Sequence, residues 1–177
     1  MTAIAGIRQP YTWNGVHAAL FAAAAVKPAD RVLDVGCGTG ATTRIAARLA
    51  SRGHAVGVDI SAPLLRTAQK LTAAEKVSNA SYQVADAQVH PFPPCGYDVI
   101  VSRGGVLSFA DPAATFRNLA RALMPGGRLA LVCPGSRCGP DRIRVVLDGW
   151  ENVEVGLRGA IRLVTAERPR RMPTDVD

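Results

Sequence analysis

Three carboxylates and a run of alternating glycines are the residues of this chain whose types and spacing could do chemistry. Asp34 lies in the apolar run RVLDV, directly before the glycine-rich stretch 36–40 (GCGTG). Asp59 and Asp86 stand at the ends of two later apolar runs, HAVGVD and SYQVAD. Glycines let the main chain pass close to a ligand where a Cβ would collide. The pattern predicts a ligand that lies against bare backbone among acids.

Each acid suits a different part of one kind of ligand. An acid at the end of a second strand can accept hydrogen bonds from both hydroxyls of a ribose. An acid at the end of a third strand can receive the exocyclic amine of an adenine, through its side chain or a neighbouring amide. Asp34 adds negative charge beside the glycines. A ligand with an adenosine and a cationic tail would suit all three acids.

A nicotinamide dinucleotide is the main alternative ligand. The pattern GxGxxA is satisfied by Gly36, Gly38 and Ala41. Its pyrophosphate would lie close to Asp34, which is electrostatically unfavourable unless the carboxylate turns away. A chain of 177 residues also leaves little room for a separate catalytic region. We therefore rank the dinucleotide second.

The elements that must position these residues alternate between short strands and helices. This order is typical of an α/β fold with a mainly parallel, doubly wound, Rossmann-like sheet, in which ligands bind at the carboxyl ends of the strands. The expected strands are 31–36, 54–59, 81–86, 97–102 and 128–133. The expected helices are 16–26, 42–52, 61–76 with Ser61 as N-cap, and one that starts at Asp111 and is stopped by the PGG of 125–127.

The pattern changes after the fifth strand. A short helix is expected over 140–150, followed by two β-like runs, 152–157 and 160–166. Runs joined so tightly must pair antiparallel, because a parallel return needs a long crossover. The sequence therefore predicts one domain over 1–167 that ends in an antiparallel hairpin, and a disordered tail over 168–177.

Charge and cysteine content limit the partners. The formal charge is +7, with 21 basic residues against 14 acidic ones. The arginines are spread along the chain, the only dense cluster is RPRR at 168–171, and aromatics that could stack on bases are few. A general surface charge is therefore the better interpretation, and nucleic-acid binding is a minority one. The four cysteines form no CxxC pair and no zinc-like spacing, which favours reduced thiols, a cytoplasmic location and no metal. The apolar run 16–26 is too short for a membrane span.

With these motifs in place, the chain resembles the class I S-adenosylmethionine-dependent methyltransferases. The agreement in order and spacing extends over 11–134, and it is nearest to the branch that includes quinone-biosynthesis (type 11) methyltransferases. The matching segments are VLDVGCGTG (32–40), VGVDIS (56–61), VADAQ (84–88), YDVIVSR (97–103) and LMPGGRLALV (123–132).

The resemblance implies a cofactor, S-adenosylmethionine, with S-adenosylhomocysteine as product, and a methyl transfer by in-line displacement to a small organic acceptor at O, N or C. It implies roles for the following residues: Asp59 for the ribose; Asp86 and Ala87 for the adenine edge; Ile60 for an adenine face; Gly36, Cys37, Gly38 and Gly40 for the methionine portion; Asp34 and the backbone near Ser102 for the amine; Arg103 for the acceptor side. It assigns no catalytic base. His17 and His90 are read as a packing residue and a solvent-facing loop residue.

The chain departs from this family between the fifth strand and the hairpin. Relatives usually insert a long helical cap there, whereas this chain has only PGSRCGPDRIRVVLDGW. Gly104 and Ser108 also replace aromatics of the usual pattern, which widens the expected pocket. Three readings stay open: an open site for a bulky acceptor, a homodimer whose second subunit supplies the cap, or a catalytically weak cofactor-binding protein that works by interaction.

Overall fold

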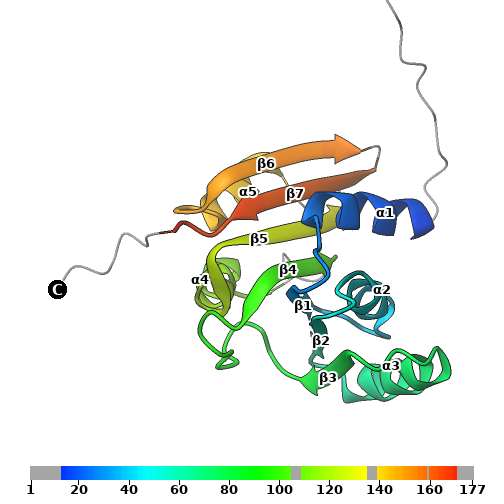
Figure 1. The fold of residues 1–177 in the computed structure, drawn as a ribbon. Coiled ribbons are helices and arrows are strands. Elements are labelled where there is room, and N and C mark those ends of the chain that lie inside the picture. Colours follow the sequence, from blue (N-terminus) through cyan, green and yellow to red (C-terminus); the bar gives the residue numbers. More distant parts are fainter. Residues whose placement is uncertain (1–12, 105–108, 135–138, 159, 171–177) are drawn as a thin grey trace, which may run out of the picture.

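One sheet of seven strands, in the order β3-β2-β1-β4-β5-β7-β6, organises the computed structural model (Figure 1). The structure describes residues 13–104, 109–134, 139–158 and 160–170. The strands are β1 (Arg31–Val35), β2 (His54–Asp59), β3 (Ala80–Val84), β4 (Tyr97–Arg103), β5 (Leu123–Pro134), β6 (Glu151–Arg158) and β7 (Ile161–Glu167). The helices are α1 (Trp13–Ala24), α2 (Ala41–Leu49), α3 (Ala62–Ala74), α4 (Pro112–Ala122) and α5 (Pro140–Val146).

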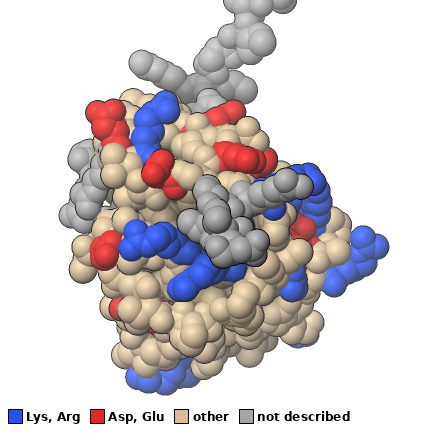
Figure 2. Space-filling view, turned by 90° about the vertical axis from the view of Figure 1, so that its left-hand side faces the viewer, with Lys and Arg blue, Asp and Glu red and all other residues tan. Residues whose placement is uncertain are grey.

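The first five strands are parallel, and β6 and β7 pair antiparallel with each other, as the sequence predicts. β1 pairs with β2 on one side and with β4 on the other, so the strand order reverses at β1. β7 pairs antiparallel with both β5 and β6. The carboxyl ends of the parallel strands form one edge of the sheet, the carboxyl edge, and their first residues form the opposite one, the amino edge, which Figure 2 faces. A ligand is expected at the carboxyl edge, beside the reversal at β1.

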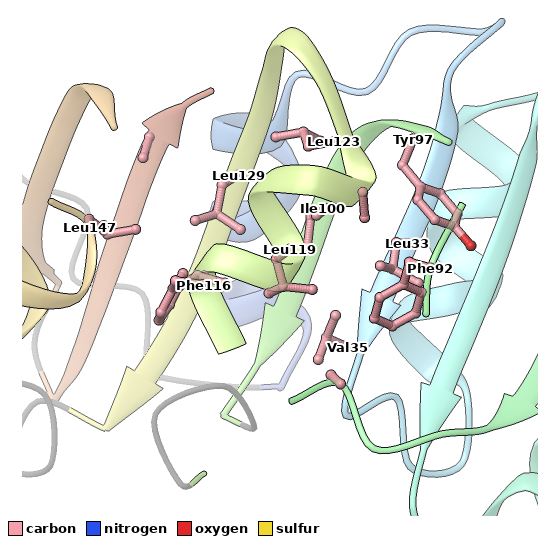
Figure 3. Packing of buried hydrophobic residues seen from close by; sticks show 14 of the residues in the cluster. Leu33, Val35, Phe92, Tyr97, Ile100, Phe116, Leu119, Leu123, Leu129 and Leu147 are labelled. Atoms are coloured by element: carbon pink, nitrogen blue, oxygen red, sulfur yellow. The ribbon is translucent and has the colours of Figure 1, made fainter. Parts of the chain in front are cut away.

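Helices cover the two faces of the sheet separately. α1, α2 and α3 pack on one face, and α4 and α5 on the other (Figure 1). Alternate residues of the central strands point to opposite faces, so Val32 joins the cluster under α1 while Leu33 joins the cluster under α4. Figure 3 shows Phe116 and Leu119 of α4 lying over the sheet, among Ile100 and Leu129.

The start of α4 follows from its sequence. The carboxylate of Asp111 accepts a hydrogen bond from the Ala114 amide at 2.8 Å, and Pro112 occupies the first turn. The helix ends at Ala122, where β5 begins, so the PGG segment lies inside β5 and does not stop the helix. That expectation is wrong because Leu123 is already extended and pairs with Tyr97.

Other boundaries differ by a few residues. α2 ends at Leu49 rather than Arg52, and β3 ends at Val84, so Asp86 follows the strand instead of ending it. Ser61 is the N-cap of α3, but its hydroxyl makes no capping hydrogen bond. At the C-terminal side, the Arg168 amide donates to the Gly127 carbonyl at 2.9 Å, so the first residue of the predicted tail is joined to the sheet.

Cysteine states differ from the expected four reduced thiols. Cys37 and Cys95 are free, whereas Cys133 on β5 is disulfide-bonded. Within the described ranges, no helix is both long and apolar enough to cross a bilayer.

Candidate functional site

A tight loop joins β1 to α2 at the carboxyl edge. The amides of Gly36 and Cys37 donate to the carbonyl of Val58 on β2, at 2.9 and 3.1 Å, so the loop is tied to the neighbouring strand. Gly38 has φ of 54°, and a Cβ built there would meet nothing within 4 Å. Gly40 has φ of 75°, and its Cβ would lie 2.4 Å from the hydroxyl oxygen of Tyr82. The loop thus needs glycine conformations and leaves open space beside Gly38.

Asp59 ends β2 and faces this loop. Its Oδ2 accepts a hydrogen bond from the Gly38 amide at 2.9 Å, and its Oδ1 accepts one from the Ser61 amide at 2.9 Å. These two bonds hold the half-buried carboxylate between the glycine loop and the start of α3. A carboxylate has about four lone-pair sites. Acceptor capacity therefore remains for the two hydroxyls of a ribose.

A small apolar cavity opens beside Asp59. Its volume is about 90 Å³. Asp59 is the only charged residue among the described residues that line it. Ile60, which also lines it, has 71% of its surface exposed and can therefore reach a ligand. The lining residues are Val35, Gly36, Val58, Asp59, Ile60, Ala85, Ala87 and Phe109. Flat apolar walls beside one carboxylate suit a nucleoside base next to its sugar.

Asp34 lies behind the loop and is almost fully buried, with 1% of its surface exposed. Its Oδ2 accepts a hydrogen bond from the Thr43 hydroxyl at 2.6 Å, whereas Oδ1 has no partner among the described residues. Burial raises the pKa of Asp34 to about 7; the Thr43 hydrogen bond and the charge of Arg103 oppose this increase, and Asp59 adds to it. A buried carboxylate oxygen without a donor marks a place where a cation or an N–H group would be stabilised.

Cys37 is a poor nucleophile despite its place in the loop. It is buried, and burial raises the pKa of its thiol, with the nearby Asp34 and Asp59 charges adding to the increase. The thiolate is the reactive form of cysteine. Cys37 therefore contributes its backbone and its packing to the loop, and no covalent chemistry.

Arg103 and His17 come together from different elements at the same edge. Arg103 ends β4, and α1 begins beside the ends of β4 and β5, where Val16 packs with Val101 and Val132. Burial lowers the pKa of His17, and the positive charge of Arg103 lowers it further. The Nε2 atom of His17 is buried and has no hydrogen-bond partner in the described part of the chain. A neutral imidazole thus lies near the Arg103 guanidinium, whose charge also reaches Asp34.

Three other predicted residues have structural contacts. The Ser102 hydroxyl donates to the Val35 carbonyl at 2.7 Å, which ties β4 to β1. The Asp86 carboxylate accepts from the backbone amide of Gln88 at 2.9 Å and from its side-chain amide, and it does not line the cavity. His90 stacks edge-on against Phe92 with ring centroids 4.7 Å apart, so it is half-buried rather than solvent-facing.

Sequence reasoning missed three contributors to this site. Thr43 is the partner of Asp34, and a hydroxyl residue in the first turn after a glycine loop is a signal that could have found it. Phe109 lines the cavity, and no local pattern indicates that a residue so far along the chain returns to β2. Tyr82 packs against Gly40, as the alternation of β3 allows. Ser108, which was also singled out from the sequence, lies outside the described residues.

The arrangement fits a nucleoside that carries a positive charge. The apolar cavity, the Asp59 carboxylate, the open backbone at Gly38 and the unpartnered oxygen of Asp34 follow one another along the carboxyl edge. A pyrophosphate fits less well, because its charge would meet two carboxylates here. In the described ranges, no group of three or more His, Cys, Asp or Glu side chains could hold a metal ion.

Comparisons with known proteins point to one family. The family model described as "Methyltransferase domain" matches residues 32–127, which is more than half of the chain. The chain is 32% identical over 146 residues to the ubiquinone/menaquinone biosynthesis C-methyltransferase UbiE of Shewanella woodyi, an alignment that covers 81% of this chain and 58% of that protein. The chain spans about half the length of the curated relatives it matches.

Solved structures share the fold. The [4+2]-cyclase SpnF superposes with a TM-score of 0.81 at 17% identity, covering 94% of this chain and 85% of that one. The phosphoethanolamine N-methyltransferase 2 of Haemonchus contortus, solved in complex with S-adenosyl-L-methionine, superposes with a TM-score of 0.80 at 21% identity, covering 91% of this chain and 54% of that one. Identities this low establish a common architecture and no common substrate.

Proposed function

The chain belongs to the class I S-adenosylmethionine-dependent methyltransferases, and from that membership we propose that it transfers a methyl group to a small organic acceptor at O, N or C by in-line displacement. The observation that carries the proposal is the placement of Asp59. Its carboxylate is held by the Gly38 and Ser61 amides at the mouth of an apolar cavity, beside the buried Asp34. These are the groups that a cationic nucleoside requires.

The chain's residues divide the cofactor between them in this proposal. Asp59 accepts the ribose hydroxyls, Ile60, Ala87 and Phe109 enclose the adenine, and the stretch 36–40 lies along the methionine portion. Asp86 receives the adenine amine through its own carboxylate or through the neighbouring Ala87 amide. Asp34 attracts the positive end of the ligand, because its Oδ1 is buried without a donor in the described part of the chain. When bound, S-adenosylmethionine supplies an activated methyl group on a sulfonium.

The protein's work is then to align the acceptor and to exclude water. Arg103 and His17 lie close to each other and do not line the cavity, and we place the acceptor beside them. The guanidinium can orient an electron-rich acceptor, and the neutral His17 can accept a proton at Nε2. An acceptor whose nucleophilic atom carries no proton would not need His17.

The segment between β5 and β6 determines what covers the acceptor side of the site. Between β5 and β6 the described residues contain only the seven-residue helix α5, so a second copy of the chain is proposed to cover the acceptor side.

A cytoplasmic location is also proposed. The two free thiols, Cys37 and Cys95, support it, whereas the disulfide-bonded Cys133 does not.

Calorimetric titration with S-adenosylmethionine and S-adenosylhomocysteine tests cofactor binding. Asp59→Ala is expected to weaken both by at least about tenfold, because hydrogen bonds to a charged acceptor contribute roughly 1.5–3 kcal/mol each. The matched control is Asp148→Ala, an exposed aspartate beyond α5, which should leave both affinities unchanged. Equal loss in the two variants, or binding of NADH in place of the two nucleosides, would contradict the assignment.

Turnover separates an active enzyme from a cofactor-binding interaction protein. The chain is incubated with a cell extract and cofactor that carries a labelled methyl group. Label in a small-molecule fraction that disappears with Asp59→Ala supports methyl transfer. Tight cofactor binding without any incorporation supports the alternative, a catalytically weak protein that acts by interaction.

A further inference from the structure

The amino edge of the sheet gathers arginines that lie far apart in the sequence. Arg31 begins β1, Arg121 lies in the last turn of α4, and Arg168 and Arg170 follow β7. We call these four residues the amino-edge cluster. In the sequence, Arg31 and Arg121 look like part of a scattered surface charge, since both stand far from the RPRR cluster that contains Arg168 and Arg170. The fold places all four around one point.

That point is Cys95, in the loop before β4. Arg31 donates from Nη2 to the Cys95 carbonyl at 3.2 Å, and the Cys95 amide donates to the Arg121 carbonyl at 2.9 Å. Arg168 donates from Nη1 to the Cys95 sulfur at 3.4 Å and to the Leu123 carbonyl. Arg31 and Arg168 are therefore held in place before any ligand arrives, which lowers the entropy that binding must cost.

Arg170 completes the cluster beside the β5 turn. The Gly126 amide donates to the Arg168 carbonyl at 2.9 Å, and a Cβ built on Gly126 would lie 3.7 Å from Nε of Arg170. Arg121 and Arg170 are both exposed, and the guanidinium of Arg121 donates from Nη2 to Asn118 Oδ1 at 3.0 Å. They can approach a ligand without desolvating a buried group.

The cluster keeps most of its positive charge. Arg31 pairs with Asp98 at 3.2 Å, and within the described residues none of the other three arginines forms an ion pair with a carboxylate. Three of the four guanidinium groups therefore have no carboxylate partner in the described part of the chain, although Glu167 directly precedes Arg168. Figure 2 shows basic side chains near the middle of this edge, with acidic ones distributed around them. A polyanion would therefore contact the cluster itself and not the acidic surface around it.

The chemistry of the cluster selects phosphate. A planar guanidinium donates two parallel hydrogen bonds to a phosphate, and arginines spaced along a surface match a chain of phosphates. A single strand is usually held by aromatic side chains that stack on its bases, and none of the large exposed hydrophobic side chains in the described ranges is aromatic. A membrane surface would be helped by large exposed apolar side chains, and no member of the cluster supplies one.

We propose that the amino-edge cluster binds the phosphodiester backbone of double-stranded nucleic acid without reading its bases. This site lies at the opposite edge of the sheet from Asp59 and the glycine loop, so it does not deliver a base for methylation. It is a docking surface that would keep the enzyme on a nucleic acid while the carboxyl edge stays free. It does not depend on the proposed methyl transfer.

Fluorescence anisotropy of a short labelled DNA duplex of mixed sequence, with the full chain, tests this. Arg121→Gln/Arg170→Gln removes two exposed arginines and leaves Arg31 and Arg168, with their contacts to Cys95, in place. We expect about tenfold weaker binding at low salt, and a plot of log K against log salt that is shallower by roughly 2, one for each lost phosphate contact. The matched control, Arg66→Gln/Arg144→Gln, removes two exposed arginines from α3 and α5 and should bind as the parent does.

Four results would overturn the proposal. One is no binding of the duplex by the parent chain, and another is equal weakening in the two double variants, which would assign binding to net charge alone. Polyglutamate of matched charge that competes as well as the duplex would remove the selection for phosphate. Binding to vesicles of phosphatidylglycerol but not to the duplex would assign the surface to a membrane. Thermal unfolding followed by circular dichroism checks that every variant is folded.

Discussion

At the scale of the residue, Asp34 couples folding to pH. Burial raises its pKa in the folded chain to about 7, from an ordinary value of 3.8. Between these two values the folded state holds more proton than the unfolded state, so Asp34 makes the protein less stable as the pH rises through this window. Above about 7 the penalty is complete.

The substitution Asp34→Asn should remove this dependence. The amide oxygen can still accept the Thr43 hydrogen bond, and no charge is buried. The variant is expected to melt at a higher temperature than the parent above neutral pH, with the difference vanishing near the ordinary pKa of 3.8, in thermal unfolding at a series of pH values. A pH-independent difference in melting temperature would contradict the assignment.

Cofactor binding should also change the protonation of Asp34. The parent is expected to release a proton when a cationic cofactor binds near neutral pH, because the positive charge favours the ionised carboxylate of Asp34. The Asp34→Asn variant has no proton to release at this position. Calorimetry in buffers of different ionisation enthalpy would detect the difference, and equal proton release by parent and variant would assign it to another group.

His17 provides a second titration at the same scale. Burial and the charge of Arg103 hold its pKa below the ordinary 6.5, so the imidazole is neutral at pH 7. Arg103→Gln removes the smaller cause and should move the NMR midpoint of His17 upward without restoring it fully. An NMR midpoint of His17 that stays unchanged in Arg103→Gln would contradict this assignment.

At the scale of the element, the glycine loop separates binding from stability. An L-residue in the left-handed region costs roughly 1–2 kcal/mol, so Gly38→Ala should destabilise the fold by about that amount. Its new methyl group meets no protein atom but projects into the open space beside the loop, and cofactor affinity should fall. Gly40→Ala should cost more stability, because the methyl would also collide with Tyr82. Urea unfolding of both variants tests the predicted losses of stability, and calorimetric titration with S-adenosylmethionine tests the predicted loss of affinity.

α4 packs on the face of the sheet opposite α2, the helix that follows the glycine loop. Phe116 is 1% exposed and meets Trp150 edge-on, with ring centroids 6.4 Å apart. Phe116→Ala should lower the free energy of unfolding by about 3–5 kcal/mol, because a cavity replaces the ring. The neighbouring Arg117→Ala is the control and should stay within about 0.5 kcal/mol, since Arg117 is exposed. A loss below about 1 kcal/mol in Phe116→Ala would mean that α4 packs loosely.

The elements themselves were largely predictable, and their ends were less so. Short apolar runs identified the five parallel strands, because a strand buried on both faces of a sheet requires such a run. Two further runs joined by a tight turn identified the hairpin. The end of β3 and the end of α4 were missed, since pairing with a neighbouring strand decides both, and pairing is not visible in a local window. Asp59 lies where its strand predicts, but its bonds to Gly38 and Ser61 depend on how two loops approach each other.

At the scale of the whole molecule, the sequence did not predict which distant residues meet. Phe109 reaches the cavity beside β2, and Arg31 reaches the loop that carries Cys95, only after the sheet has formed. Composition revealed the excess of positive charge but not its place, because the amino edge collects chain segments from separate connections. The two edges of the sheet therefore suit different ligands: the carboxyl edge suits a cationic nucleoside, and the amino edge suits a polyanion.

The contrast between the two free thiols makes the protein convenient for single-site labelling. Cys37 is buried and its thiol stays protonated, whereas Cys95 is only half-buried and touches the guanidinium of Arg168. Of these two, a maleimide dye should modify Cys95 alone under native conditions. The attached fluorophore would sit at the centre of the amino-edge cluster, and its emission would report on any polyanion that arrives there while the opposite edge of the molecule remains chemically untouched.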